Sequence, residues 1–306
     1  MVKKLYNKIN YFFYKFSDNS QSIFCIIGSC FLMSFLVGIV RYLSAFYDPS
    51  FIVMVRNIFA LAILMPYIYK NYRNIFTRNK LTINILRASS GFLSMTMWFY
   101  AVSMIPIADA VSISFIVPSL TTIFAIIFLK EKINIKNWIS IIIGLIGVLI
   151  IIRPGFKEFN IAYLLMIVSA CFWAISNILT KILSASQQPI NVVAYLTTIM
   201  TILSVPFGVF YIQPLTIFSI FLLIAMAIIS NLSYFLLSKS YSKADLSIVQ
   251  PFDFTRLIFS ALIGYFIFDE KVDLLTIIGS LIILCGLLIA LPKKNINQKP
   301  ISSIST

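Results

Sequence analysis

The chain has 306 residues, of which 60% are hydrophobic and only 11% are charged, and its formal net charge is +14. An ordinary soluble domain is about 45–50% apolar and about 25% charged, so the composition predicts a protein embedded in lipid. It excludes a soluble enzyme, a DNA-binding protein and a secreted factor.

Ten apolar runs, separated by charged or turn-forming residues, are each long enough to cross a bilayer as a helix of about 20 residues. The predicted spans, in chain order, are Gln21–Val40, Phe51–Tyr69, Ile83–Met104, Ile107–Leu129, Ile133–Ile152, Asn160–Ile182, Ile190–Tyr211, Pro214–Ser238, Leu246–Phe268 and Val272–Leu291. Only the pair Ile105-Pro106 separates the third span from the fourth, and proline is typical of such a turn. The sequence therefore predicts an all-α integral membrane protein with ten transmembrane helices.

Basic residues set the predicted orientation. With the N-terminus inside, seventeen of the 24 Lys and Arg residues fall in cytoplasmic segments and four fall outside. Lys and Arg are enriched in cytoplasmic loops, so we expect both termini to be cytoplasmic. Residues 1–20 form a predicted amphipathic leader on the membrane surface, and residues 292–306 a tail. These loops account for the positive charge, and we expect no nucleic-acid partner.

The second half of the chain matches the first at a shift of 139–140 residues. The shift superimposes Arg41-Tyr42-Leu43-Ser44 on Lys181-Ile182-Leu183-Ser184, Pro49 on Pro189, Glu131-Lys132 on Glu270-Lys271, and Gly147 on Gly286. We therefore expect two repeats, 21–152 and 160–291. Each has five spans, so the second enters the membrane from the opposite side, as in transporters built from inverted repeats. A duplicated scaffold without transport is the alternative.

Paired segments of the two halves are similar to the ten-span EamA-type branch of the drug/metabolite transporter superfamily. The paired segments are Pro118…Phe-Leu-Lys-Glu131, followed by Gly144-Leu-Ile-Gly147, and Pro251…Phe-Asp-Glu270, followed by Gly279…Gly286. Three further, unpaired segments resemble the same branch: Ile-Leu-Arg87, Met97-Trp98-Phe99-Tyr100-Ala101 and Gln250-Pro-Phe-Asp-Phe-Thr-Arg256. The resemblance covers about 20–291 and implies secondary transport across a bacterial inner membrane, with no particular substrate. Pro118 aligns with Leu257 rather than with Pro251, so the two prolines are not equivalent.

Ionisable side chains inside a membrane each cost ~2.5–3.5 kcal/mol on insertion scales and are candidates for function. Asp253 lies about seven residues into the ninth predicted span, and Arg256 follows one helical turn later on the same face. Asp253 could accept a proton or a substrate cation, and Arg256 could hold its charge or a substrate carboxylate. A structural ion pair is the alternative. Pro118 and Pro251 are the candidate hinges.

Aromatic and amide side chains within the spans are further candidates for substrate binding. They are Trp98, Tyr100, Trp173, Asn177, Asn231 and Tyr234. Trp and Tyr rings offer faces to planar or cationic solutes. The alternative is that these aromatic residues lie in the belts at the membrane–water interfaces, a placement that we expect for Trp138. Arg56 and Arg87 lie near span ends, where we expect them to reach the membrane interface.

The predicted function is uptake of a small organic metabolite, such as an S-adenosylmethionine-like or amino-acid-like solute, by alternating access. The chain has no histidine and no GxxxxGK loop, so we expect no cofactor, no metal and no direct use of ATP. The expected partners are the solute and the lipid bilayer, and nothing in the sequence indicates an oligomeric state. An exporter of the same fold, a lipid-modifying membrane enzyme and a passive channel are the alternatives.

Overall fold

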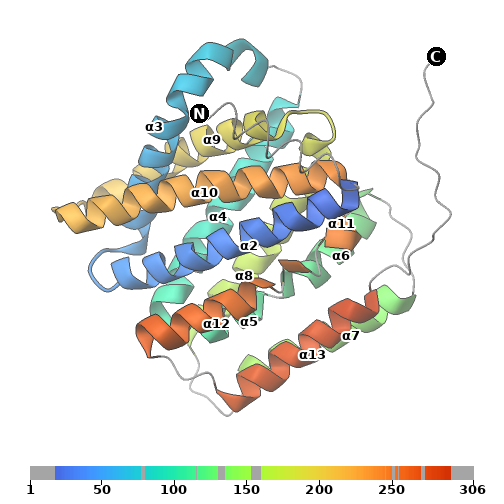
Figure 1. Ribbon diagram of the computed structural model, residues 1–306. Helices are drawn as coiled ribbons and strands as arrows, with labels where there is room; N and C mark the ends of the chain where they lie inside the picture. The colour runs from blue at the N-terminus through green and yellow to red at the C-terminus, as the bar shows by residue number, and fades with distance from the viewer. Residues whose placement is uncertain are drawn as a thin grey trace, which may run out of the picture.

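The computed structural model describes residues 18–76, 80–114, 116–129, 135–152, 160–244, 246–249, 252–253, 255–269 and 273–290. Every regular element in these ranges is helical (Figure 1), which confirms the all-α class. The predicted leader lies outside the described residues except for its last three residues, which begin the first described helix. The predicted tail, 292–306, also lies outside them.

The helices of the two halves follow one another with short connections. The first half contains α2 (Asp18–Leu43), α3 (Pro49–Ile75), α4 (Leu81–Met104), α5 (Ile107–Ser114), α6 (Ile116–Leu129) and α7 (Ile135–Ile152). The second contains α8 (Ile161–Ser184), α9 (Pro189–Gly208) with the 3-10 turn η1 (Val209–Tyr211), α10 (Ile217–Lys243), α11 (Leu246–Val249), α12 (Thr255–Phe268) and α13 (Leu274–Ala290). The turn predicted at Ile105-Pro106 is confirmed, because α4 ends at Met104 and α5 begins at Ile107.

The ninth predicted span differs from a single regular helix. Between α11 and α12, Phe252 and Asp253 adopt 3-10 geometry. The bonding pattern of the backbone therefore changes beside the charged residues that the sequence singled out.

Helix bounds in the two halves agree at the shift found in the sequence. A shift of 139 residues carries Ile116–Leu129 onto Thr255–Phe268, which are the bounds of α6 and α12. A shift of 140 carries Pro49 onto Pro189, the first residues of α3 and α9. Proline is favoured at this position because its missing N–H would have no partner in the first turn.

A basic side chain in each half binds the carbonyls at the end of another helix. Arg41 of α2 donates through Nη1 to the carbonyls of Val102 and Ser103 at 2.9 Å each. Lys181 of α8 donates through Nζ to the carbonyls of Tyr241 and Ala244 at 3.1 and 2.9 Å. Cations stabilise helix C-termini, where carbonyls lack helical partners. This explains why Arg41 and Lys181 occupy matching positions in the repeat.

Serine pairs join helices of opposite halves. Ser29 of α2 and Ser233 of α10 each donate a hydroxyl to the other's carbonyl at 3.1 Å. Ser94 of α4 and Ser169 of α8 form the same reciprocal contact at 2.9 and 2.8 Å. Small polar residues allow close packing and hydrogen bonds between membrane helices. The two pairs are equivalent under the repeat, so α2 packs on α10 as α8 packs on α4.

Helices α7 and α13 lie side by side along one edge of the bundle (Figure 1). A Cβ atom added to Gly147 of α7 would lie 2.7 Å from the carbonyl oxygen of Gly279 and 2.5 Å from Ile283 Cγ1. A Cβ at this position would fit only if the backbone of Gly279 moved, and small residues allow such close approach of membrane helices. Gly147 therefore fixes how closely the last helices of the two halves approach.

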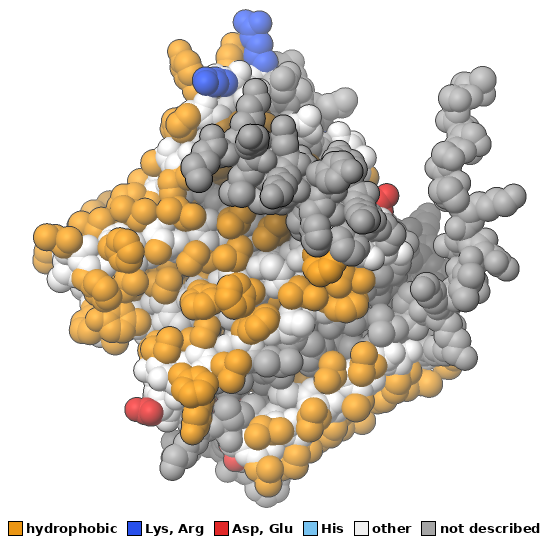
Figure 2. Space-filling view, in the orientation of Figure 1, with side chains coloured by type: hydrophobic (Ala, Val, Ile, Leu, Met, Phe, Trp, Pro, Cys, Tyr) orange, Lys and Arg blue, Asp and Glu red, His pale blue; other side chains and the backbone are white. Residues whose placement is uncertain are grey.

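Five of the described helices are long and apolar enough to cross a membrane: α2, α3 over Pro49–Arg73, α8, α9 extended to Tyr211, and α10. The others are shorter or, like α4, carry more polar side chains. Hydrophobic side chains cover much of the described surface of α2, α10 and α13 in Figure 2. The protein is thus an all-helical, multi-pass membrane protein, and the count of ten spans stays a prediction.

Candidate functional site

A central cavity lies between the two halves. It has an empty volume of about 610 Å³, including its opening. Helices of the first half contribute Met33, Leu36, Val37, Arg56, Ser94, Met95, Trp98, Phe99, Ser114 and Val117. Helices of the second half contribute Met166, Ser169, Ala170, Trp173, Tyr234 and Arg256. Its mostly apolar wall with a few polar groups is typical of small-molecule sites.

Two smaller pockets adjoin the cavity. One, of about 250 Å³, contains Arg87 and Asn177 and is called the Arg87 pocket. The other, of about 350 Å³, contains Asp253 and is called the Asp253 pocket. Trp173 lines the central cavity and both pockets. Its ring therefore stands where the three spaces meet.

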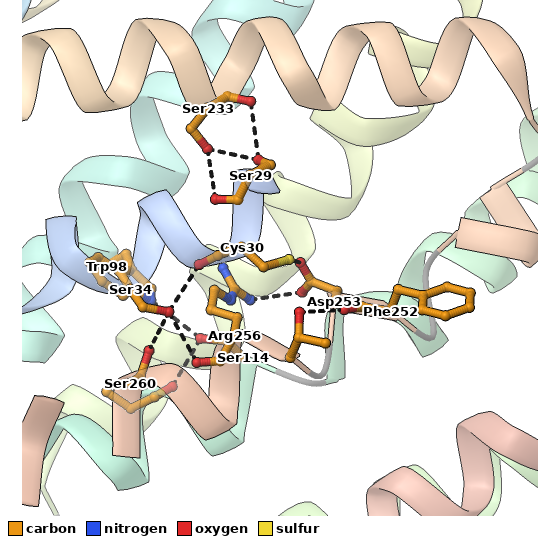
Figure 3. Close-up of polar contacts among 12 residues, drawn as sticks. Ser29, Cys30, Ser34, Trp98, Ser114, Ser233, Phe252, Asp253, Arg256 and Ser260 are labelled. Atoms are coloured by element: carbon orange, nitrogen blue, oxygen red, sulfur yellow. Dashed lines mark hydrogen bonds and ion pairs between the residues drawn. The ribbon is translucent and has the colours of Figure 1, made fainter. Parts of the chain in front are cut away.

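Asp253 and Arg256 form the ion pair that the sequence predicts (Figure 3). Arg256 Nη2 lies 3.0 Å from Asp253 Oδ2, one helical turn apart, and their side chains are 14% and 20% exposed. The thiol of Cys30 in α2 donates to Asp253 Oδ1 at 3.2 Å. The hydroxyl of Ser34, also in α2, donates to the Arg256 carbonyl at 3.2 Å. The pair thus joins the start of α12 to α2 at the edge of the cavity.

The predicted aromatic residues Trp98, Trp173 and Tyr234 come together around the cavity. The rings of Trp173 and Tyr234 have centroids 6.1 Å apart and are tilted by 37°. The Trp98 indole donates to Ser114 Oγ at 3.2 Å, and Ser114 in turn donates to the carbonyl of Ala110 at 2.9 Å. Because its N–H has a partner, Trp98 is held with part of its ring against the cavity. These rings could stack on a planar or cationic solute.

The structure places Tyr100 and Asn231 elsewhere. The Tyr100 hydroxyl donates to Asp48 Oδ1 at 2.9 Å and lies 2.8 Å from Ser50 Oγ, at the start of α3. The Asn231 amide donates to the carbonyl of Ala60 at 2.9 Å. Neither residue lines the central cavity, the Arg87 pocket or the Asp253 pocket. Both side chains join helices instead.

Of the two candidate hinges, the structure describes Pro118 but not Pro251. Pro118 lies buried near the start of α6 as it is described. Pro251 falls outside the described residues. The 3-10 geometry of Phe252 and Asp253 follows Pro251 directly in the chain.

The expectation that Arg56 and Arg87 reach the membrane interface is wrong, since each is only 3% exposed. Arg56 lines the central cavity. Arg87 Nε donates to Thr180 Oγ1 at 2.6 Å, and its Nη1 donates to the Val192 carbonyl at 3.3 Å. The sequence singled out Asp253 because it is an ionisable residue about seven residues into its predicted span. Arg56 lies equally deep, seven residues beyond Pro49, or roughly 10 Å along the helix.

The arrangement can bind a small amphipathic solute. The described walls supply aromatic faces, one carboxylate paired to an arginine, and a second arginine within the cavity. Because both halves line the same space, a relative movement of the halves would change its shape. Such a site is typical of transporters with a binding site near the membrane midplane.

Comparison with known proteins agrees with this description. The sequence pattern of the EamA-like transporter family matches residues 20–153 and 160–291. An S-adenosylmethionine uptake transporter of Rickettsia bellii is 30% identical over 80% of this chain and 84% of its own length. A riboflavin transporter of Vibrio cholerae is 28% identical over 71% and 74%. A pseudopaline exporter of Pseudomonas aeruginosa is 25% identical over 86% and 93%.

The fold also occurs among solved structures, and one crystal structure serves for comparison. It superimposes with a TM-score of 0.66 and covers 89% of this chain and 96% of its own. The sequence identity is 15%, so this likeness concerns the fold alone.

Proposed function

The chain belongs to the EamA-like transporter family, and on that premise we propose that it takes up an S-adenosylmethionine-like or amino-acid-like solute through the central cavity. The family and the relatives make it a membrane transporter of small metabolites and not an enzyme. The relatives differ in their solutes and in direction, so the solute class proposed here depends on the chemistry of the cavity.

The observation that carries the proposal is the cavity wall made by both halves. Trp98, Trp173 and Tyr234 provide ring faces, and Asp253 lies in the pocket next to them. A cation beside a ring face and a carboxylate is favoured by both. S-Adenosylmethionine carries a sulfonium cation, a planar base and an amino-acid group. Its base and its cation can lie against the ring faces, and its cationic groups can pair with Asp253.

The proposed mechanism is alternating access between two inverted repeats. We place ten spans in a bacterial inner membrane, with the repeats 21–152 and 160–291 in opposite orientations and both termini in the cytoplasm. The agreement of helix bounds at a shift of 139–140 residues supports this arrangement. The equivalent serine pairs support it too, because each joins one helix of the first half to one of the second.

In this mechanism Asp253 accepts either a proton or the solute cation. Arg256 then holds the carboxylate between cycles and releases it when the cation arrives. In the structure, Arg256 Nη2 lies 3.0 Å from Asp253 Oδ2. A purely structural pair would instead stay closed throughout transport.

Uptake by proteoliposomes tests the function. We expect labelled S-adenosylmethionine to accumulate with saturation, and to be displaced by excess unlabelled solute. Asp253→Asn should reduce uptake at least tenfold. The matched control is Asp18→Asn, which also removes an ion-paired carboxylate, since Asp18 binds Lys243 at 2.9 Å and is 72% exposed. Equal uptake by wild type and Asp253→Asn would contradict the proposed role of the carboxylate.

Export is the second candidate, favoured by the likeness to the pseudopaline exporter. Cells that express the protein distinguish the two directions. Uptake predicts that external labelled solute accumulates inside the cells. Net loss of preloaded solute, faster than in cells without the protein and without accumulation from outside, would instead establish an exporter.

A further inference from the structure

Arg56 is a buried cation in the wall of the central cavity. It lies on α3, is 3% exposed and contributes directly to the lining. Its Nη2 donates to the side-chain oxygen of Asn57, and the guanidinium lies against the Tyr234 hydroxyl. Its Nε is buried and has no hydrogen-bond partner in the described part of the chain. Both neighbours are neutral, so neither balances its charge.

The other two arginines at these pockets have different surroundings. Arg256 is ion-paired with Asp253 at 3.0 Å. Arg87 donates to the hydroxyl of Thr180 and to the carbonyl of Val192, both within the helix bundle. Among the described residues, no carboxylate pairs with Arg56. Arg256 also has a buried Nε without a partner among the described residues, but its charge is paired with Asp253. Arg56 is therefore the arginine of this cavity that combines an unpartnered Nε with a charge that no described carboxylate balances.

A guanidinium held in a low-dielectric space without a counter-ion is costly, because burial removes its hydration. A carboxylate offers two oxygens in the geometry of the guanidinium fork and can bind it bidentately. We propose that Arg56 binds the carboxylate of the transported solute. This inference rests on the proposed function and narrows its solute class to molecules with a free carboxylate.

Arg56 and Asp253 then divide the recognition of a zwitterionic solute. Arg56 holds the carboxylate in the central cavity, and Asp253 attracts the cationic part from the adjoining pocket. Trp173 lines both the central cavity and the Asp253 pocket, so its ring lies between the proposed carboxylate site and the proposed cation site. A solute without the carboxylate would leave the buried Arg56 without a counter-ion, which costs affinity.

The test compares S-adenosylmethionine with its decarboxylated analogue, which keeps the sulfonium, the base and the amine. Binding to the purified full-length protein in detergent is measured by titration calorimetry. We expect the wild type to bind S-adenosylmethionine roughly tenfold to a hundredfold more tightly than the analogue, the range for a charged hydrogen-bonded contact. Arg56→Gln should bring this affinity ratio close to one, mainly by weakening the binding of S-adenosylmethionine.

Arg41→Gln is the matched control, because it also removes an arginine, but one that donates to helix carbonyls and lines none of the three pockets. It should lower the thermal stability and leave the affinity ratio as in the wild type. Should Arg56→Gln fail to fold, Arg56→Lys keeps the charge without the fork and should still reduce the ratio. An unchanged ratio in a folded Arg56 variant would overturn the inference and leave the proposed function standing. A wild type that binds neither ligand would instead contradict the proposed function.

Discussion

The two halves share their helix contacts but differ in what they present to the cavity. Ser29 and Ser94 of the first half have serine at the matching positions of the second, and all four take part in contacts between helices. The cavity-lining positions behave differently. Trp173 matches Met33, Tyr234 matches Met95, Asp253 matches Ser114, and Arg256 matches Val117.

The duplicated backbone must meet two requirements, helix packing and solute binding, and the two requirements constrain different positions. Helix packing needs the same small polar residues in both halves, since each half packs on the other in the same way. A solute is not symmetric, so its binding site needs different groups on its two sides. The second half supplies the ion pair and two of the rings, and the first half supplies Arg56, whose matching position in the second half is Leu196.

The largest effect on stability and uptake is expected when Asp253 is replaced by serine, the residue at the matching position (Ser114) of the first half. Asp253→Ser leaves Arg256 buried without its carboxylate, which should lower the free energy of unfolding by about 3 kcal/mol, the lower end of the range for buried pairs because this one is partly exposed. Uptake should fall at least a hundredfold. Denaturant or thermal unfolding and proteoliposome uptake measure the two effects.

The double variant Asp253→Ser with Arg256→Val reproduces the first-half residues completely. It should recover most of the lost stability, because no buried charge is left unpaired. Uptake should remain lost. Recovery of uptake in this double variant would show that the pair is structural only.

An intermediate effect is expected at the ring that lines all three spaces. Trp173→Met introduces the first-half residue and removes the aromatic face, so the affinity for S-adenosylmethionine should fall roughly threefold to thirtyfold. Trp138→Met is the control, since Trp138 is 50% exposed on α7. Similar losses in both variants would argue against stacking in the cavity.

A smaller effect is expected at the shared helix contacts. Ser29→Ala and Ser94→Ala should each lower the free energy of unfolding by about 0.6 kcal/mol, the average for hydrogen bonds between membrane helices. The two losses should be equal, because the contacts are equivalent. A clear inequality, measured by unfolding in mixed detergents, would contradict the match between the two interfaces.

The smallest effect on binding is expected at Tyr100. Tyr100→Phe removes the hydroxyl that binds Asp48 and Ser50. It should lower stability by about 1 kcal/mol and leave the solute affinity within twofold of the wild type. A tenfold loss of affinity in calorimetry would place Tyr100 in the binding site after all.

Much of the fold was accessible from the sequence because lipid imposes a simple pattern. Apolar runs located the helices, Pro106 located the turn between α4 and α5, and Pro49 and Pro189 marked equivalent helix starts. The second span was predicted to end at Tyr69. The backbone of α3 leaves helical geometry two residues later, at Asn71 (φ −122°, ψ 16°), and a further helical segment runs to Ile75.

The site was only partly accessible for a related reason. A membrane helix that is apolar on all sides gives no periodic signal of which face points inward. Residue type and position within a span selected Trp173 and Asp253, which line the site, and also Tyr100 and Asn231, which join helices. Arg56 was passed over because its distance from the span end suggested that it could reach the interface, whereas packing of α3 against its neighbours buries it.

The central claim is that the solute binds beside Trp173, between the two halves. The chain has three tryptophans, so Trp98→Phe with Trp138→Phe leaves Trp173 as the single reporter. Titration of this variant with S-adenosylmethionine, followed by tryptophan fluorescence, should give a saturable change with the same midpoint as calorimetry. Binding seen by calorimetry without any change in Trp173 fluorescence would contradict the account.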